Sequence, residues 1–160
     1  MSDTYAGLDV IDFDHHFVVD PFTREITSKT PQKDFLMQND HNSERFTFEV
    51  PRFVEGRDLS LCNLVRVYYR NGRKNGRYTI ADIKVHPFLN EVVFCTWLIS
   101  QNATSSVGPL SFMLKFAQLS DEELIDYAWS TKTYEKVEVI ASIDGSDVSE
   151  YDYAVPENEM

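Results

Sequence analysis

Residues 40–71 read DHNSERFTFEVPRFVEGRDLSLCNLVRVYYRN, and this stretch decides the fold class. Residues 46–50 alternate Phe, Phe and Val with Thr and Glu, and residues 61–70 place Val, Val and Tyr opposite Arg, Tyr and Arg. A period of two is typical of a β-strand with one buried face. Pro51 ends the first strand, because proline has no N–H for the hydrogen-bond ladder. The stretch predicts the frame of a β-sandwich and contains no obvious catalytic centre.

The rest of the chain continues this pattern. Further strands are predicted over residues 22–27, 77–84, 91–100, 110–117, 124–131 and 134–143, with a short apolar piece over residues 34–38. Residues 71–75 carry an Asn-Gly hairpin signal. Residues 119–123 have the length of a hairpin turn, although residues 119–124 could also form one helical turn that Ser120 and Glu123 would cap. No longer helical pattern is present to serve as a crossover, so we expect an all-β, antiparallel sandwich of immunoglobulin-like or jelly-roll-like type.

The net charge of −11 is concentrated at the two ends of the chain. Residues 1–20 contain five acids and residues 143–160 contain six, without a base in either segment, and the remaining 15 acids match the 15 bases. We expect a flexible acidic arm over residues 1–20, a β-sandwich domain over residues 21–143, and a flexible acidic tail over residues 144–160. Such ends either keep the chain soluble or bind a basic partner, and they disfavour nucleic-acid binding.

Neither membrane insertion nor export is predicted. No apolar run approaches the 18 residues of a membrane span, and the N-terminus lacks the basic region of a signal peptide. The expected site of synthesis is therefore a reducing cytoplasm, in which Cys62 and Cys95 are expected to be buried free thiols. Trp97 follows the second cysteine, which differs from the immunoglobulin Cys–Trp–Cys order.

The densest group of metal-binding residue types is Asp12, Asp14, His15 and His16. Neighbouring side chains in a strand point to opposite faces, so only one of the two histidines could readily join the aspartates. We therefore expect solvated polar residues here, and we assign no metal ion.

Catalytic residues are likewise not assigned. His41 lies in the polar segment 40–43 beside an Asp and a Ser, but the G-x-S-x-G elbow of a serine hydrolase is absent. Glu49 and Glu55, or residues 121–123, could supply a pair of carboxylates, and charged turns are the simpler interpretation. Dinucleotide and P-loop fingerprints are absent as well. We predict a protein that is not an enzyme and has no cofactor.

Several aromatic and polar residues invite a glycan interpretation. Trp97 and Trp129 stand among apolar neighbours, which favours core positions over a sugar-stacking platform. The Tyr68–Tyr69 pair and the C-terminal Tyr-Asp-Tyr of residues 151–153 could offer an aromatic surface to a partner, although edge-strand tyrosines are the simpler alternative. The Asn-Ala-Thr sequon of residues 102–104 indicates only a polar loop.

The chain also resembles a known family. DHNS, PR-x-x-x-G-x-DLS and TWLIS occur within the opening stretch and within CTWLISQNATSSVGPLSFMLKFAQ (residues 95–118), which YAWSTKTYEKVEV (residues 127–139) follows. Together these segments, covering residues 35–142, resemble the N-terminal domain of the upper baseplate proteins in tails of phages that infect Gram-positive bacteria. The resemblance implies a β-sandwich docking module of the distal tail, without catalytic residues to transfer.

The functional expectation follows from this resemblance. It implies a structural protein of the virion, made in the bacterial cytoplasm, that binds other tail or baseplate proteins and forms homo-oligomers in the particle. The sequence ends at Met160 without the shaft and distal domain that such proteins usually carry, so a role in direct host recognition stays open. The alternative expectation is a carbohydrate-binding module for a glycan of the host surface.

Overall fold

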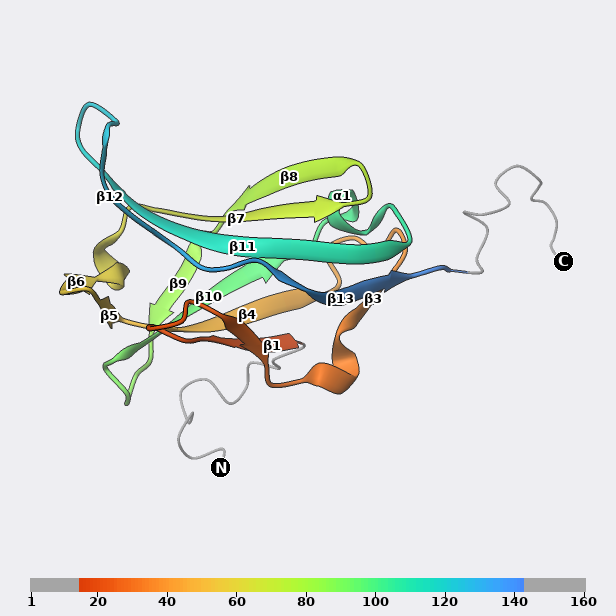
Figure 1. Cartoon of the computed structure of the whole chain (residues 1–160), viewed down its shortest axis with the longest axis horizontal. Helices are drawn as coiled ribbons and strands as arrows, with labels where there is room; N and C mark the ends of the chain where they lie inside the picture. The colour runs from red at the N-terminus through yellow and green to blue at the C-terminus, as the bar shows by residue number, and fades with distance from the viewer. Residues whose placement is uncertain (1–14, 143–160) are drawn as a thin grey trace, which may run out of the picture.

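The alternating segments form strands of two sheets that face each other in the computed structural model, which describes residues 15–142 (Figure 1). One sheet has five strands in the order β2-β1-β4-β10-β9. The other has six, in the order β3-β13-β11-β7-β8, with β12 beside β11. The all-β sandwich predicted from the sequence is confirmed. No helix within the described residues has the length and apolar character needed to cross a bilayer.

The element bounds show how short most strands are. The five-stranded sheet consists of β1 (His15–Val19), β2 (Ile26–Ser28), β4 (Arg45–Pro51), β9 (Asp82–Val85) and β10 (Val92–Leu98). The six-stranded sheet consists of β3 (Phe35–Met37), β7 (Leu64–Asn71), β8 (Lys74–Thr79), β11 (Gly108–Leu119), β12 (Ile125–Ser130) and β13 (Tyr134–Ile140). Outside the sheets lie η2 (Pro31–Lys33), the pair β5 (Phe53–Val54) and β6 (Arg57–Asp58), η3 (Leu59–Leu61) and α1 (Gln101–Thr104).

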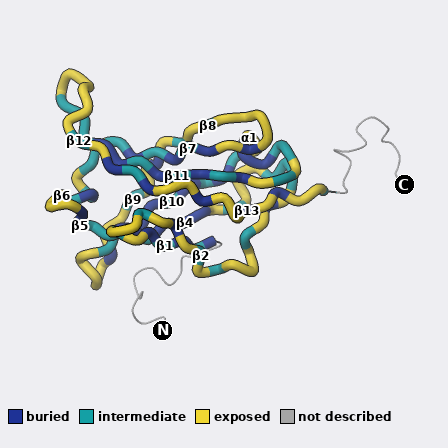
Figure 2. The backbone as a smooth tube through the Cα atoms, in the orientation of Figure 1, coloured by how far each residue is buried: buried dark blue, intermediate teal, exposed yellow. Residues whose placement is uncertain are grey.

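The core lies between the sheets, and along several strands buried residues alternate with more exposed ones (Figure 2). β4 contributes the three residues of the predicted alternation, and β11 contributes four, all at most 1% exposed: Phe46, Phe48, Val50, Leu110, Phe112, Leu114 and Phe116. The outward positions between them are polar or half-buried. The period-two interpretation of these strands is thereby confirmed.

One aromatic ring connects the two layers. Phe112, on β11, has its ring centroid 5.4 to 5.7 Å from those of five other aromatic residues: Phe17, Phe46, Phe48, Trp97 and Tyr134. Four of these five partners lie on β1, β4 and β10 of the opposite sheet. Most of the pairs are edge-to-face, an arrangement that stabilises aromatic cores beyond the area they bury.

The sheets are mixed, so the prediction of a purely antiparallel sandwich is wrong in this respect. β1 pairs with β4 in parallel, and β3 pairs with β13 in parallel. Parallel neighbours need a long connection, and the chain supplies one in each case. Residues 20–44 separate β1 from β4, and most of the domain separates β3 from β13.

The N-terminal part of the fold also differs from the prediction. β1 takes His15–Val19 into the sheet, so the sandwich starts within the segment expected to be an arm. The predicted strand over residues 22–27 is shortened to β2, because Asp20 Oδ1 accepts hydrogen bonds from the N–H groups of Phe22 and Thr23 and closes a turn. The rest of the expected arm and the tail over residues 144–160 lie outside the described residues.

Two local predictions are corrected. The predicted strand over residues 77–84 is split, because the chain leaves one sheet after β8 and enters the other at β9. The hairpin turn predicted over residues 119–123 is confirmed and the helical turn considered over residues 119–124 is wrong: Ser120 Oγ accepts from the N–H groups of Glu122 and Leu124, and Glu123 has a φ of 64°. Helix α1 instead lies in the segment expected to be a polar loop.

Both cysteines are free, as predicted. Cys95 is buried in β10, and burial raises the pKa of its thiol. Cys62 is only half-buried and follows η3 rather than lying in a strand, so the expectation of burial holds for Cys95 alone. Burial, the largest cause, also raises the pKa of the Cys62 thiol.

We expect Phe112→Ala to lower the free energy of unfolding by about 3–5 kcal/mol, because it removes the ring that both sheets contact. Phe22→Ala is the matched control, since Phe22 is 91% exposed, and we expect a change within about 0.5 kcal/mol. Urea denaturation followed by tryptophan fluorescence measures both. Equal effects of the two substitutions would contradict the central place of Phe112.

Candidate functional site

The two histidines of β1 have separate carboxylate partners. His15 Nε2 lies 2.6 Å from Glu44 Oε1, and His16 Nε2 lies 3.0 Å from Glu49 Oε1. His15 is 2% exposed and packs against Phe46, so the expectation of a solvated residue is wrong for His15. Residues 15–142 contain no group of three or more side chains suited to a metal ion. Asp12 and Asp14, the other two residues of this group, lie outside the described residues.

The polar turn of residues 40–43 is hydrogen-bonded to helix α1. His41 Nδ1 accepts from the backbone N–H of Gln101 at 2.9 Å, and the carbonyl oxygen of Asp40 accepts from Thr104 Oγ1 at 2.8 Å. In the middle of the turn, Asn42 has a φ of 58° and donates its N–H to the carbonyl oxygen of Ile99. His41 Nδ1 is therefore engaged in attaching the turn to the first residue of α1.

The carboxylates considered as a catalytic pair lie on different elements and have different partners. Glu49, on β4, contacts His16, whereas Glu55, in the β5–β6 turn, accepts from Arg24 Nη2 at 2.7 Å and from the Tyr127 hydroxyl at 3.3 Å. Burial and the nearby Glu55 raise the pKa of the Tyr127 phenol. Residues 121–123 are exposed in the β11–β12 turn. The charged-turn interpretation holds for Glu55 and for residues 121–123.

The aromatic candidates divide between core and surface. Trp97 and Trp129 are each 1% exposed, which confirms the core interpretation. Tyr69 is buried and stacks on Trp97, with ring centroids 5.3 Å apart, and its hydroxyl accepts from Asn102 Nδ2 at 2.7 Å. Tyr68 faces outward and is half-buried. The sequon asparagine is thus part of a structural contact, and the tyrosines of residues 151–153 lie outside the described residues.

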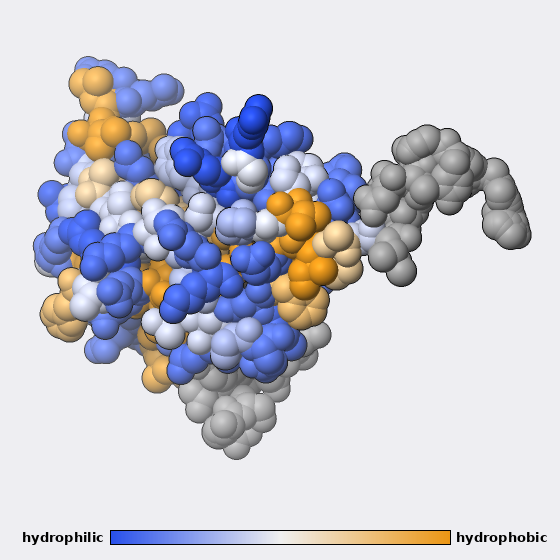
Figure 3. Space-filling model, turned by 45° about the vertical axis from the view of Figure 1, so that its right-hand side comes forward, coloured by the Kyte–Doolittle hydropathy of each residue, from blue (hydrophilic) through white to orange (hydrophobic). Residues whose placement is uncertain are grey.

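An apolar edge patch, defined here as Phe35, Met37 and Ile140, is the first surface that could bind a partner. These side chains are 44%, 36% and 44% exposed, and Ile140 is the register partner of Met37. Hydrophobic side chains gather near the end of β13 in Figure 3. Among residues 15–142, β3 pairs only with β13 and forms one edge of the six-stranded sheet, so no described strand occupies its other side.

A groove of about 320 Å³ runs beside this edge patch. Its lining comes from one strand of each sheet, β1 and β3, and from the segments beside them: His15, Lys33, Phe35, Leu36, Met37 and Glu44. Lys33 and the His15–Glu44 pair add polar groups beside the three apolar side chains, and His15 Nδ1 is buried without a hydrogen-bond partner among the described residues. The edge patch and the groove together give this end of the sandwich apolar contacts, a polar anchor and an open strand edge.

A second surface is the basic face, on the outside of β7, β8 and β11. Residues 59–81 contain five bases and no acid, and β11 adds Lys115. The register places four of these cations on the outer side of the sheet: Arg66, Arg70, Arg77 and Lys115. The other two, Arg73 and Lys74, lie at the tip of the β7–β8 hairpin. Within the described residues, no ion pair joins any of these six cations to an acid.

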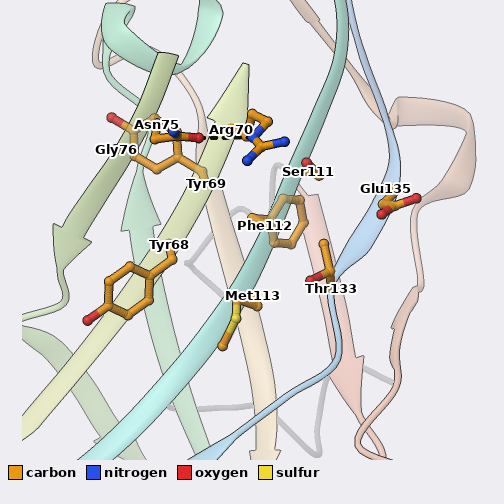
Figure 4. Close-up of a pocket in the computed structure, with 10 residues that line it drawn as sticks. All are labelled: Tyr68, Tyr69, Arg70, Asn75, Gly76, Ser111, Phe112, Met113, Thr133 and Glu135. Atoms are coloured by element: carbon orange, nitrogen blue, oxygen red, sulfur yellow. Dashed lines mark hydrogen bonds between the residues drawn. The ribbon is translucent and has the colours of Figure 1, made fainter. Parts of the chain in front are cut away.

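A shallow hollow of about 440 Å³ opens on the basic face (Figure 4). Arg70 donates from Nε to Asn75 Oδ1 at 2.9 Å, while Ser111 and Glu135 lie on the neighbouring strands across the hollow. Tyr68 contributes an aromatic ring to the rim. The hollow therefore offers hydrogen-bond donors and acceptors around a predominantly positive surface.

Gly76 lines this hollow beside the Tyr69 ring. A Cβ atom at position 76 would lie within 2.3 Å of Tyr69 Cζ, closer than atoms can approach. The absence of a side chain at this position lets the Tyr69 ring cross the neighbouring strand and reach Asn102. Glycine is needed here for space, since its φ is not in the left-handed region.

We expect Gly76→Ala to lower the free energy of unfolding by about 1–3 kcal/mol, because Tyr69 must move from Trp97 and Asn102. Thr79→Ala, at an exposed position of the same strand, is the control and should change stability by less than about 0.5 kcal/mol. Thermal and urea unfolding measure the difference. A Gly76→Ala variant as stable as the unsubstituted protein would show that the Tyr69 ring has room to shift.

Comparisons with known proteins identify structural rather than sequence relatives. No protein-family model matches the chain, and no curated protein matches it. Seven chains of solved structures do match, and one is the N-terminal domain of phage TP901-1 ORF48. That match covers 79% of this chain and 96% of the other, with a TM-score of 0.49 and 15% sequence identity. A phage protein is thus among the structures that this chain resembles, and we draw no functional conclusion from a likeness of this strength.

Proposed function

We propose that this protein is a non-enzymatic structural component of a phage tail, a docking module of the distal tail or baseplate. It is made in the cytoplasm of the bacterial host and is incorporated into the virion. The family resemblance of residues 35–142 supplies the biological setting. The edge patch is the observation that carries the proposal, because it gives the domain a surface on which another subunit can dock.

The edge patch has the properties of a protein-binding surface. Single exposed apolar residues are ordinary, but here two residues of the edge strand β3 and one of its neighbour β13 lie together, and the outer side of β3 is unpaired among the described residues. A partner strand could hydrogen-bond to β3 while its side chains pack on Phe35 and Met37, the mode known as strand addition. Repetition of such a contact around the tail axis leads us to propose a homo-oligomer in the particle.

The proposal of a role without catalysis is supported by how the reactive side chains are used. His41 accepts a hydrogen bond from the backbone of α1. Glu49 contacts His16, and Glu55 accepts hydrogen bonds from Arg24 and Tyr127. Each of these contacts serves to position backbone or a neighbouring strand.

Binding of a host-surface glycan is the second candidate, and the hollow on the basic face is the observation that favours it. Tyr68 offers a ring face beside Asn75, Ser111 and Glu135, which can exchange hydrogen bonds with sugar hydroxyls. A glycan array separates the two functions. Hits that are lost in Tyr68→Ala would support the glycan function, and the absence of hits would leave docking as the function.

The docking function predicts that the protein is present in purified virions and that incorporation depends on the edge patch. We expect Phe35→Glu combined with Met37→Glu to reduce incorporation at least tenfold, because two charges would have to be buried at the interface. Quantitative mass spectrometry of purified particles, after complementation of a deletion phage, measures the effect.

The control for this experiment is Phe22→Glu, a charge at a more exposed apolar residue, outside the edge patch, in the turn between β1 and β2. Its incorporation should match that of the unsubstituted protein. Absence of the unsubstituted protein from purified particles would contradict the proposed function. Normal incorporation of the double variant would show that another surface is the docking site.

A further inference from the structure

We propose that the acidic C-terminal segment, residues 143–160, binds the basic face of its own chain. The inference concerns a contact within one molecule, so it goes beyond the proposed function and can be tested without phage particles. It rests on the charges of the two partners and on the position at which the chain leaves the fold.

The charges of the two partners are complementary. Residues 143–160 carry six acids and no base, while residues 59–81 carry five bases and no acid. Several other cations of the domain already have an acidic partner: Arg24 with Glu55, Arg52 with Asp58, Lys84 with Asp82, and Lys132 with Glu25. The cations of the basic face, in contrast, form no ion pair with an acid among the described residues. They lie on the outer side of the six-stranded sheet and at the tip of its β7–β8 hairpin.

The geometry brings the segment to this face. β13 leads out of the sheet at the end where the β7–β8 hairpin turns, as the registers show: Val139 lies opposite Gly108, Leu110 opposite Asn71, and Asn71 opposite Lys74 (Figure 1). β11 and β7 lie between β13 and β8, which corresponds to a lateral distance of about 14 Å at the usual strand spacing. A fully extended segment of 18 residues spans up to about 60 Å, so it can cross the whole face.

The N-terminal segment is a poorer occupant although it is also acidic. It leads into β1, which belongs to the five-stranded sheet, whereas the basic face is the outer side of the six-stranded sheet. To reach this face, residues 1–14 would have to pass around the sandwich. This difference makes the N-terminal acids a matched control for the C-terminal ones.

Covalent attachment of the C-terminal segment to the domain favours this weak contact. Each exposed ion pair is individually weak and is screened by salt, so the contact depends on several pairs formed together. Because the segment is attached to the domain, its local concentration near the basic face is in the millimolar range, well above that of a free partner in dilute solution. The contact should therefore form at low ionic strength and be lost at high salt.

The test compares three forms of the full-length chain by ¹⁵N NMR at about 20 mM and about 1 M salt, conditions that bracket strong and weak screening. One form is unsubstituted. The second neutralises the C-terminal acids by Asp144→Asn, Asp147→Asn, Glu150→Gln, Asp152→Asn, Glu157→Gln and Glu159→Gln. The control neutralises N-terminal acids by Asp3→Asn, Asp9→Asn and Asp12→Asn. Equal melting temperatures establish that all three forms are folded.

We expect neutralisation of the C-terminal acids to shift the amide signals of β7, β8 and Lys115 at low salt, with the difference vanishing at high salt. The N-terminal control should leave these signals in place. The same low-salt shifts should not depend on protein concentration. Unchanged signals on the basic face, equal shifts in the control, or shifts that grow with concentration would overturn the proposal, the last because it indicates binding to a second copy.

A second readout uses an added polyanion. If the segment covers the basic face, inorganic polyphosphate should bind the variant with neutralised C-terminal acids at least threefold more tightly than the unsubstituted protein at low salt. Arg66→Gln with Arg70→Gln and Arg77→Gln should remove this binding. Equal polyphosphate affinity of the two proteins would show that the face is open and would overturn the proposal.

Discussion

The contact between Phe112 and the aromatic rings of the opposite sheet is the constraint on which the rest of the structure depends. β11 is the longest strand, and it pairs with β7 on one side and with β13 and β12 on the other. Its inward ring lies within 5.7 Å of rings from β1, β4 and β10. The cluster thus packs the six-stranded sheet against the five-stranded one.

The two surfaces of interest follow from this arrangement. Because β11 is anchored from inside, its outer side and the outer sides of β7 and β8 must face solvent, which exposes the basic face. At the far side of the same sheet, β3 has a described partner strand on one side only, and its alternation buries Leu36 while exposing Phe35 and Met37. The domain therefore presents an apolar edge and a basic face on the same sheet, which are the two surfaces on which the proposals rest.

The sequence predicts which face of a strand is buried wherever apolar and polar residues alternate with a period of two. The inward residues of β4 and β11 were predicted correctly, because alternation along a strand reports directly which side is buried. The parallel partners of β1 and β3 could not be predicted, since local pattern carries no information about distant neighbours. Likewise, the change of sheets around Ile80 depends on tertiary packing: its N–H bonds to Val65 and its side chain is buried.

The candidate site was less accessible to sequence reasoning than the fold. The edge patch requires knowing which strand lies at an edge, and the short segment 34–38 gives no sign of this. The basic face had a readable signal, because residues 59–81 lack acids entirely. Its meaning still depended on the hairpin register, which places Arg66, Arg70 and Arg77 on one side.

The central claim is that the Phe112 cluster makes the two sheets one cooperative unit, and native-state hydrogen exchange tests it most directly. The claim predicts that the slowest amides of β4 and β11 exchange with the same opening free energy, equal to that of global unfolding. It also predicts that Phe112→Ala lowers both values by the same amount. Separate opening free energies for the two strands, or a loss confined to β11, would contradict it.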